Sequence, residues 1–465
     1  MITAIESILY PFVVKFNEYL SNYILVSLLV GVGLWYTVKT RFVQIRCFKE
    51  GLYNSFGNFS LFGEKNKNSV SPYQALTTAI AAQVGTGNIV GASAAVLVGG
   101  PGVVFWMWII AFFGMATIYA EASLAVKTRI VEENGDIKGG PVYYITTAFK
   151  GKTGRFLASF FAVAIILALG FMGCMVQSNS ISYTMQTAFN VQPWIIGIVQ
   201  VILCAMIFIG GVRRLTSVTE KLVPVMAVTF LIGAFFVLAV RYNYIFDTFK
   251  MIFKYAFEPQ AIIGGGFWYA IKTAISQGAK RGLFSNEAGM GSTPHIHALA
   301  RVKTPHEEGT IAMIGVFVDT FVILTLNALV IISTMYTSDG LLANGYTGAV
   351  TELLNKTNLV QNAFGSIMGE HSGAVFVAVC LCFFAFSSIL CWNFFGKINA
   401  IYLFKRNHKK AVLVYTLISL CFVMAGSLVS SDLVWELTDM FNNLMVIPNV
   451  LALFALTNLV IGKVK

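Results

Sequence analysis

The sequence predicts an all-α polytopic membrane protein with eleven transmembrane helices. Hydrophobic residues make up 57% of the 465 residues, charged residues make up 11%, and the mean hydropathy is +0.74. A soluble chain of this length needs far more polar surface. Because about 20 apolar residues cross the hydrocarbon core of a bilayer, the chain has room for roughly ten to twelve spans in a single membrane domain.

Eleven apolar segments are long enough to be spans. They lie at residues 21–38, 73–98, 102–126, 156–189, 194–211, 220–240, 264–292, 309–337, 373–404, 411–429 and 433–461. Residues 1–20 lack the basic start and small-residue cleavage site of a signal peptide. We expect these residues to form a short amphipathic helix at the membrane interface.

The basic residues alternate between the two sides of the membrane, as eleven spans require. On one side, Lys and Arg cluster within residues 39–67, 127–155, 213–221, 301–303, 405–410 and 463–465. The connections on the opposite side hold Lys15, Arg241, Lys250, Lys254 and Lys356. Since basic loops stay in the cytoplasm, we predict a cell-membrane protein with its N-terminus outside and its C-terminus inside. This placement accounts for the net charge of +11 without a nucleic-acid partner.

The second span contains an interruption at residues 81–91. Three glycines there alternate with Gln83, Thr86 and Asn88, which form hydrogen bonds. Such a break is tolerated at membrane depth where it is buried in protein or lines a wet cavity. It indicates a secondary transporter whose site lies near the midplane. The alternative is that the glycines serve helix packing alone.

The seventh span is also rich in small and polar residues, from Thr273 to Gly282. It lies five spans after the second and runs in the opposite sense. Paired interruptions of this kind indicate an inverted repeat, so we predict a first helix followed by a 5+5 inverted repeat with two discontinuous helices. The predicted divisions are 1–40 (N-terminal segment and first helix), 41–72 (cytoplasmic connection), 73–240 (first repeat), 241–263 (extracellular connection) and 264–465 (second repeat).

Two long runs, Gln83–Asn88 (QVGTGN) and Gly282–Ser292 (GLFSNEAGMGS), are too specific to arise from hydrophobic patterning. Shorter runs accompany them at Gly99–Gly102, Phe105–Trp108, Phe112–Thr117, Tyr119–Glu121 and, more loosely, Phe386–Trp392. Together they resemble the alanine or glycine:cation symporter family. The resemblance implies the five-plus-five fold shared with the neurotransmitter:sodium symporters. It also implies sodium-coupled uptake of alanine, glycine or similar small neutral amino acids by a carrier that is not an enzyme and has no cofactor besides the coupling ion.

A zwitterionic amino acid needs partners for both of its charges. We expect the backbone N–H groups of Thr86, Gly87 and Asn88, with the Thr86 hydroxyl, to bind its carboxylate, because they open the outer half of the second span. By position in the similar fold, Ser276 and Gly278 lie at a break of the seventh span and offer carbonyls to the ammonium group.

Three further residues are candidates for the amino acid site. Gln177, an amide in the fourth span, is either a ligand or a partner in an interhelical hydrogen bond. Trp392 and Phe171 are candidates for the wall of a small apolar pocket, and aromatic packing is the alternative for both.

Sodium binding needs several oxygen ligands. The carbonyls of Ala81 and Val84 end the inner half of the second span, where the helix dipole favours a cation. The related fold implies that Ser387, Ser388 and the Phe384 carbonyl complete the site. The alternative for the two serines is hydrogen bonding within their own helix.

Ionisable residues inside a membrane suggest function. Asp319 is a candidate proton or second-cation site. Glu121 and Glu287 are candidates for an inner gate, paired with basic groups near the cytoplasmic surface, or for a structural ion pair. We expect His295, His297, His306, His371 and His408 at the surface, and the seven cysteines as packing residues without a disulfide or metal.

Three rival functions have different requirements. An ion channel needs a continuous polar pore, and most of the spans are uniformly apolar. An enzyme needs a nucleophile with its base or a metal cluster at membrane depth, and no such motif occurs in the spans. The nearest rival is a proton-coupled small amino acid carrier that uses Asp319.

Overall fold

The protein, here a computed structural model, is described at residues 2–57, 70–133, 136–258, 267–345, 350–429 and 432–462. Lys65, Lys67, Lys463, Lys465 and the predicted start of the seventh span at residue 264 lie outside these ranges.

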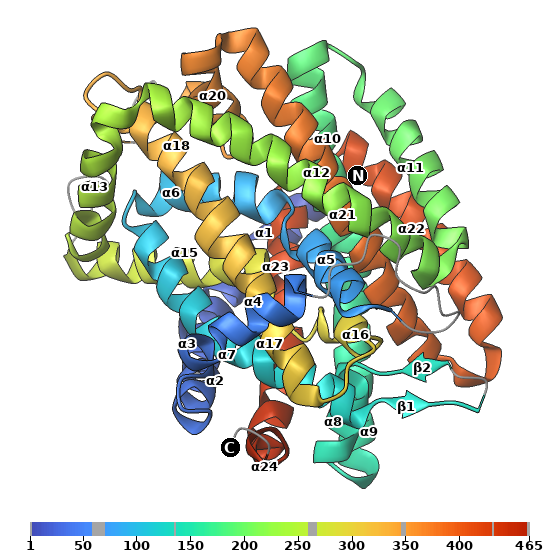
Figure 1. Ribbon diagram of the computed structural model, residues 1–465. Helices are drawn as coiled ribbons and strands as arrows, with labels where there is room; N and C mark the ends of the chain where they lie inside the picture. The colour runs from blue at the N-terminus through green and yellow to red at the C-terminus, as the bar shows by residue number, and fades with distance from the viewer. Residues whose placement is uncertain are drawn as a thin grey trace.

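The fold is almost entirely helical (Figure 1). The helices are α1 Ile2–Tyr19, η1 Leu20–Leu25, α2 Val26–Lys39, α3 Val43–Arg46, α4 Phe48–Phe56, α5 Pro72–Gln83, η2 Gly87–Gly91, α6 Ala92–Gly99, α7 Val103–Thr128, α8 Pro141–Ala148, α9 Gly151–Ile165, η3 Ile166–Gly173, α10 Cys174–Phe189, α11 Pro193–Ile209, α12 Gly211–Val240, η4 Tyr242–Tyr244, α13 Ile245–Phe257, α15 Phe267–Asn286, α16 Pro294–His297, α17 Pro305–Val316, η5 Phe317–Leu324, α18 Thr325–Met335, α19 Val350–Leu353, α20 Leu359–Met368, α21 Glu370–Leu403, η6 Lys405–Asn407, α22 His408–Leu428, α23 Asp432–Ala455 and α24 Thr457–Ile461. A small antiparallel hairpin, β1 Ile130–Val131 and β2 Ile137–Lys138, pairs Ile130 with Lys138.

Eight continuous helical stretches among the described residues are long and apolar enough to cross a membrane. They are Leu9–Lys39, Val103–Thr128, Gly151–Phe189, Gly211–Val240, Pro305–Met335, Glu370–Leu403, Lys405–Leu428 and Asp432–Ala455. The pair Pro72–Gln83 and Gly87–Gly99, bent by 46°, makes a ninth. The other two predicted spans correspond to α11, which has 17 residues, and to α15, which carries Lys272, Lys280 and Arg281. By length and composition, the structure therefore supports nine of the eleven predicted spans.

The N-terminal segment differs from its prediction. It is not a separate interfacial helix, because η1 joins α1 to α2 in one continuous helix. The Asn17 amide in α1 donates to the carbonyl and the carboxylate of Glu436 in α23, at 2.6 and 2.7 Å. This contact holds the N-terminal helix against α23.

The helix α5 lies in the interior and is packed against α12, α17 and α21, as Figure 1 shows near the centre of the view. A capping box fixes its start: the Ser71 hydroxyl accepts from the Gln74 N–H at 3.1 Å, and the Gln74 side chain accepts from the Ser71 N–H at 3.2 Å. Pro72 follows at the first helical position, where its missing N–H is harmless. Every residue from Ala75 to Gln83 is buried, so this short helix has no lipid-facing side along that stretch.

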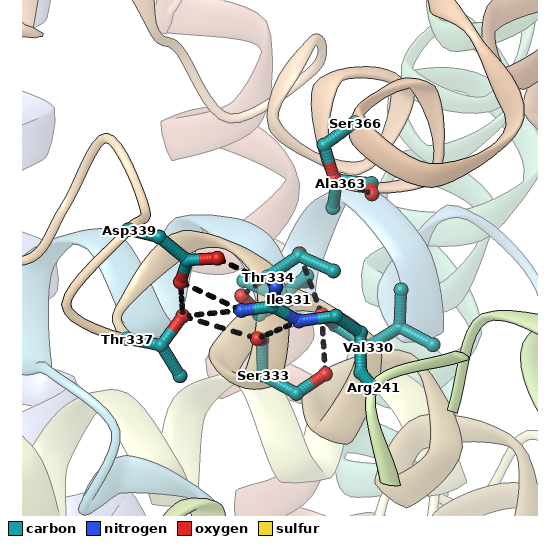
Figure 2. Close-up of polar contacts among 9 residues, drawn as sticks. All are labelled: Arg241, Val330, Ile331, Ser333, Thr334, Thr337, Asp339, Ala363 and Ser366. Carbon is teal, nitrogen blue, oxygen red and sulfur yellow. Dashed lines mark hydrogen bonds and ion pairs between the residues drawn. The ribbon is translucent and has the colours of Figure 1, made fainter. Parts of the chain in front are cut away.

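At the end predicted to be extracellular, Arg241 joins α12 to the end of α18 (Figure 2). Its guanidinium donates to both oxygens of Asp339, at 2.6 and 2.8 Å, to the Thr337 hydroxyl at 2.7 Å, and to the Ser333 carbonyl at 2.9 Å. The bonds from Arg241 and Thr337 hold the pKa of Asp339 well below its usual value. This bidentate pair therefore stays ionised at neutral pH.

Candidate functional site

The second span is interrupted between Gln83 and Gly87. The helix α5 ends at Val84, whose backbone is extended, and the chain resumes as the wide turns of η2. The Asn88 side chain accepts from the Gly85 N–H at 3.0 Å and so caps the second half. All residues from Val84 to Gly91 are buried. Backbone groups and polar side chains thus meet inside the protein, as the sequence predicts.

Glycine is required at two positions of this interruption. A Cβ at Gly85 would collide with the Ser388 hydroxyl and lie 3.0 Å from the Gln177 amide nitrogen. A Cβ at Gly87 would lie 3.0 Å from the Phe284 ring and 3.1 Å from the Ser285 Cα. The glycines therefore allow α15 and α21 to approach the broken backbone closely.

Four of the five predicted sodium ligands lie together. The Ser387 hydroxyl is 3.1 Å from the Ala81 carbonyl oxygen and 2.8 Å from that of Phe384. The Ser388 hydroxyl is 3.2 and 3.1 Å from the same two oxygens. Val84 follows at the extended end of α5, where helix carbonyls lack intrahelical partners. Uncharged oxygens from α5 and α21 thus converge, and the serines also bond within their own helix, as the alternative stated.

Several polar atoms at the interruption are buried without a hydrogen-bond partner among the described residues: the Thr86 hydroxyl, the Gln177 amide nitrogen, and the side-chain oxygens of Gln83 and Asn327. The other end of the Gln177 amide accepts from the Thr86 N–H at 3.0 Å. A buried, unpaired polar group costs about 1–3 kcal/mol. These unpaired groups lie close together, as expected of a site where a bound polar solute supplies the missing hydrogen bonds.

Asp319 is fully buried and ties the interruption to the eighth span. One of its carboxylate oxygens accepts from the Asn88 amide at 2.7 Å, and the other accepts from the Ser285 and Thr320 hydroxyls at 2.9 and 2.8 Å. The Asn327 amide donates to the Asn88 carbonyl at 2.8 Å. The Asn88 side chain is therefore fully used in positioning the broken segment, and the Asn88 N–H makes a long bond of 3.3 Å to the Gly85 carbonyl.

The predicted break at Ser276 and Gly278 is wrong. The helix α15 runs without interruption from Phe267 to Asn286. Gly278 is a packing residue, since a Cβ there would lie 2.7 Å from the Cβ of Trp106 in α7. The chain leaves the helix after Asn286, in a turn where the positive φ angles are 57° at Glu287 and 90° at Gly289.

Glu121 stabilises this turn from α7. Its carboxylate accepts from the Gly289 N–H at 3.0 Å and from the Asn449 amide at 2.5 Å. Asn449, in α23, also donates to the Gly289 carbonyl at 2.9 Å and accepts from the Tyr144 hydroxyl. Sequence reasoning missed Asn449, although an amide beside Pro448 inside an apolar span was a visible signal.

Glu287 lies in the turn itself and accepts from the Trp392 indole N–H at 2.6 Å and from the Ser292 hydroxyl. Within the described part of the chain, neither Glu121 nor Glu287 forms an ion pair, so the predicted pairing with basic groups is wrong. Lys280 and Arg281 instead pair with Asp439, at 2.7 and 3.3 Å.

The two aromatic candidates lie in different surroundings. Trp392 contacts Phe284 edge to face, with ring centroids 5.7 Å apart, and Phe284 borders Gly87. Phe171 stacks on Tyr415 and Phe422 at 5.6 and 4.8 Å. Trp392 thus belongs to the surroundings of the interruption, whereas the ring contacts of Phe171 are those of helix packing.

Two of the five histidines are buried, which corrects the surface prediction. His295 lies 2.8 Å from the Asn399 amide, and His297 lies 2.7 Å from the Glu308 carboxylate. Burial lowers the pKa of His295 to about 4. Both rings have polar partners, which makes their burial tolerable; Asn399 is 104 residues from His295, and Glu308 is 11 residues from His297.

Comparison with known proteins identifies the class to which this site belongs. A family model described as "Sodium:alanine symporter family" matches residues 6–465. The sodium/alanine symporter AgcS of Methanococcus maripaludis is 37% identical over 451 residues, 97% of this chain and 95% of its own length. The probable sodium/glutamine symporter GlnT of Bacillus subtilis is 35% identical over 449 residues, 97% of this chain and 88% of its own.

Among solved structures, MhsT in complex with L-phenylalanine is similar, with a TM-score of 0.57 and 15% identity. The match covers 84% of this chain and 90% of that one, and it shows a shared transporter fold. The protein is thus a multi-pass membrane carrier and not an enzyme. It belongs to the sodium:alanine symporter family and is a cation-coupled amino acid transporter.

Proposed function

We propose that the protein imports alanine, glycine or a similarly small neutral amino acid together with sodium, by alternating access. The observation that carries this proposal is the interruption of the second span, where unpaired polar atoms of Thr86 and Gln177 lie beside a cluster of uncharged oxygens. The basic side of the membrane is expected to be cytoplasmic, which orients uptake inward.

The sodium ion is expected to bind the carbonyls of Ala81 and Phe384 and the hydroxyls of Ser387 and Ser388. Each hydroxyl now faces a carbonyl. When the hydroxyl protons rotate away, all four oxygens can face a cation. The Val84 carbonyl is the fifth candidate, and the C-terminal end of α5 adds a favourable dipole.

The amino acid carboxylate is expected to bind the Thr86 hydroxyl, the Gln177 amide nitrogen and the backbone N–H groups of Gly87 and Asn88. These groups lie at the start of the outer half of the span, where helix N–H groups commonly lack intrahelical acceptors. The Asn88 N–H makes a long bond of 3.3 Å to the Gly85 carbonyl, which it would exchange for the carboxylate. Gln177 currently accepts from the Thr86 N–H, so its amide is oriented with the nitrogen available.

The ammonium group needs an acceptor other than Ser276 and Gly278, whose carbonyls belong to a continuous helix. We assign this role to the Phe284 carbonyl, which lies in the last turn of α15. That oxygen is 3.3 Å from the position of a Cβ at Gly87. The Phe284 and Trp392 rings then bound a short side chain, which favours alanine and glycine over larger substrates.

Radiolabelled alanine uptake into proteoliposomes tests the proposal. A potential of about 100 mV contributes ~2.3 kcal/mol per charge, and a tenfold sodium gradient adds ~1.4 kcal/mol. One sodium ion can thus sustain accumulation of a few hundredfold. We expect uptake with external sodium and its loss when choline replaces sodium. Undiminished uptake in choline would contradict sodium coupling.

A proton-coupled carrier is the second candidate, because Asp319 is a fully buried carboxylate bonded to the interruption through Asn88. In that mechanism, an imposed pH gradient drives alanine uptake in choline medium, and Asp319→Asn abolishes it. The donors around Asp319 suit an ionised carboxylate, and we therefore place sodium coupling first.

A further inference from the structure

A cluster outside the transport site combines three metal-ligating side chains. Cys47 lies at the start of α4, Glu50 lies in its first turn, and His306 lies in the first turn of α17. One ligand atom from each lies within 4.8 Å of the others. Among the described residues, this is the one group of three Cys, His, Asp or Glu side chains found at such spacing. The sequence analysis expected the cysteines to be packing residues without a metal, and Cys47 has two potential metal ligands as neighbours.

The His306 ring is held with one nitrogen toward the cluster. Its Nδ1 lies 2.7 Å from the Tyr119 hydroxyl of α7, and its Nε2 lies 3.3 Å from the Glu50 carboxylate. Metal-binding histidines typically have their other ring nitrogen hydrogen-bonded, which fixes the ring orientation. Because a hydroxyl both donates and accepts, Tyr119 supports either tautomer, including the one that leaves Nε2 unprotonated.

The backbone around the cluster is well anchored. Thr304 caps α17 by accepting from the Glu307 N–H at 3.2 Å. The Asn54 amide in α4 donates to the Thr310 hydroxyl in α17 at 3.1 Å. These contacts hold the two helices that carry the ligands, so an ion would not have to assemble them.

The donor set selects the kind of ion. We propose that Cys47, Glu50 and His306 bind a divalent transition-metal ion of the Zn²⁺ class, with water as the fourth ligand. Thiolate, imidazole and carboxylate are the protein ligands of Zn²⁺, whereas Mg²⁺ and Ca²⁺ prefer oxygen alone. The Glu50 side chain is 47% exposed, which gives an ion access from water.

Binding requires that the thiol lose its proton, which leaves to solvent as the metal–sulfur bond forms. Burial and the nearby Glu50 carboxylate raise the pKa of the Cys47 thiol. Affinity for the metal is therefore expected to increase with pH. The ion would join the connection after the first span to the inner end of the eighth span, and this role is independent of which amino acid is transported.

Cobalt titration of the purified full-length protein, carrying no histidine tag, tests this site. We expect one Co²⁺ per chain, a thiolate-to-cobalt charge-transfer band, and displacement by Zn²⁺. Cys47→Ser should abolish the band, and Cys421→Ser, at an exposed cysteine elsewhere, should retain it. Tyr119→Phe, measured on the folded protein, should keep the band but weaken cobalt affinity roughly 10- to 100-fold.

Glu50→Gln, at an exposed position, keeps the proposal falsifiable if Cys47→Ser fails to fold. It should weaken cobalt affinity by at least about tenfold, since even the hydrogen-bond partners of metal ligands contribute that much. The proposal is overturned if the parent protein shows no thiolate band, if the band persists in Cys47→Ser, or if Glu50→Gln binds as tightly as the parent.

Discussion

Two irregular turns lie in the core of this protein, and they differ in how their polar groups are satisfied. At the interruption of the second span, the Thr86 hydroxyl and the Gln177 amide nitrogen are buried without partners among the described residues. At the turn after α15, Glu121 and Glu287 accept hydrogen bonds from backbone, indole and amide donors.

This difference separates a binding turn from a structural one. Because an unpaired buried polar group costs about 1–3 kcal/mol, a turn that keeps several of them is expected to gain bonds from a ligand. A turn whose carboxylates are already bonded gains nothing from a ligand and fixes the backbone instead. Mutations at the first turn should therefore change transport, and mutations at the second should change stability.

The largest effect is expected from Gly85→Ala. Its Cβ would collide with the Ser388 hydroxyl beside the oxygen cluster, and overpacking of about 1–3 kcal/mol corresponds to uptake slower by a factor of about 5 to 150. Gly31→Ala is the matched control, because a Cβ there meets nothing within 4 Å. Equal uptake by the two variants in proteoliposomes would show that the first turn is not part of the transport site.

Asn449→Ala tests the second turn. It removes partners from Glu121, Tyr144 and the Gly289 carbonyl, and the free energy of unfolding should fall by about 1–3 kcal/mol. Thermal melting in detergent measures the loss, with the exposed Asn458→Ala as control. The folded fraction should keep the parent's half-saturating sodium concentration. A large shift in that concentration would show that the second turn also takes part in sodium binding, which contradicts its assignment as a structural turn.

Ser388→Ala should raise the half-saturating sodium concentration about fivefold to tenfold, the equivalent of one lost oxygen ligand at ~1 kcal/mol or slightly more. Ser366→Ala is the matched control, since Ser366 also bonds within its own helix, to the Ala363 carbonyl (Figure 2), but lies in α20. Sodium-dependence curves of alanine uptake provide the measurement. An unchanged curve for Ser388→Ala would refute the cation assignment.

The smallest effect is expected away from both turns, at Arg241→Lys. Lysine cannot reproduce the bidentate contact with Asp339, so the melting temperature should fall by about 1–2 °C, without a change in sodium dependence. The depressed pKa of Asp339 means that this contribution is present above its unfolded-state pKa of about 4. It is lost as the pH falls further through the folded-state pKa, so the contribution of this pair to the melting temperature should be constant between about pH 5 and 8.

Local sequence was sufficient for the first turn and insufficient for the second. Glycines alternating with Gln83, Thr86 and Asn88 are incompatible with a lipid-facing helix, so the interruption was predictable from composition. Gly278 resembled the glycines of this interruption in sequence, but in the structure it allows α15 to pack closely against Trp106. The real end of α15 depends on Glu121 and Asn449, which are more than 150 residues distant from Gly289.

Local sequence was also insufficient to predict the sodium cluster and the metal cluster, because each joins residues that are far apart in the chain. Ser387 and Ser388 were assigned through the family resemblance, because no local pattern links them to Ala81, about 300 residues away. Cys47 and His306 are likewise 259 positions apart in sequence, and packing of α4 on α17 brings them together. Burial of His295 depends in the same way on Asn399, 104 residues away.

The most direct test is a structure determined with alanine and sodium bound. We predict density for the amino acid against the Thr86 hydroxyl and the Gln177 amide nitrogen, and an ion among the oxygens of Ala81, Phe384, Ser387 and Ser388. Alanine bound instead at the turn that follows α15, with Thr86 and Gln177 unliganded, would contradict the account.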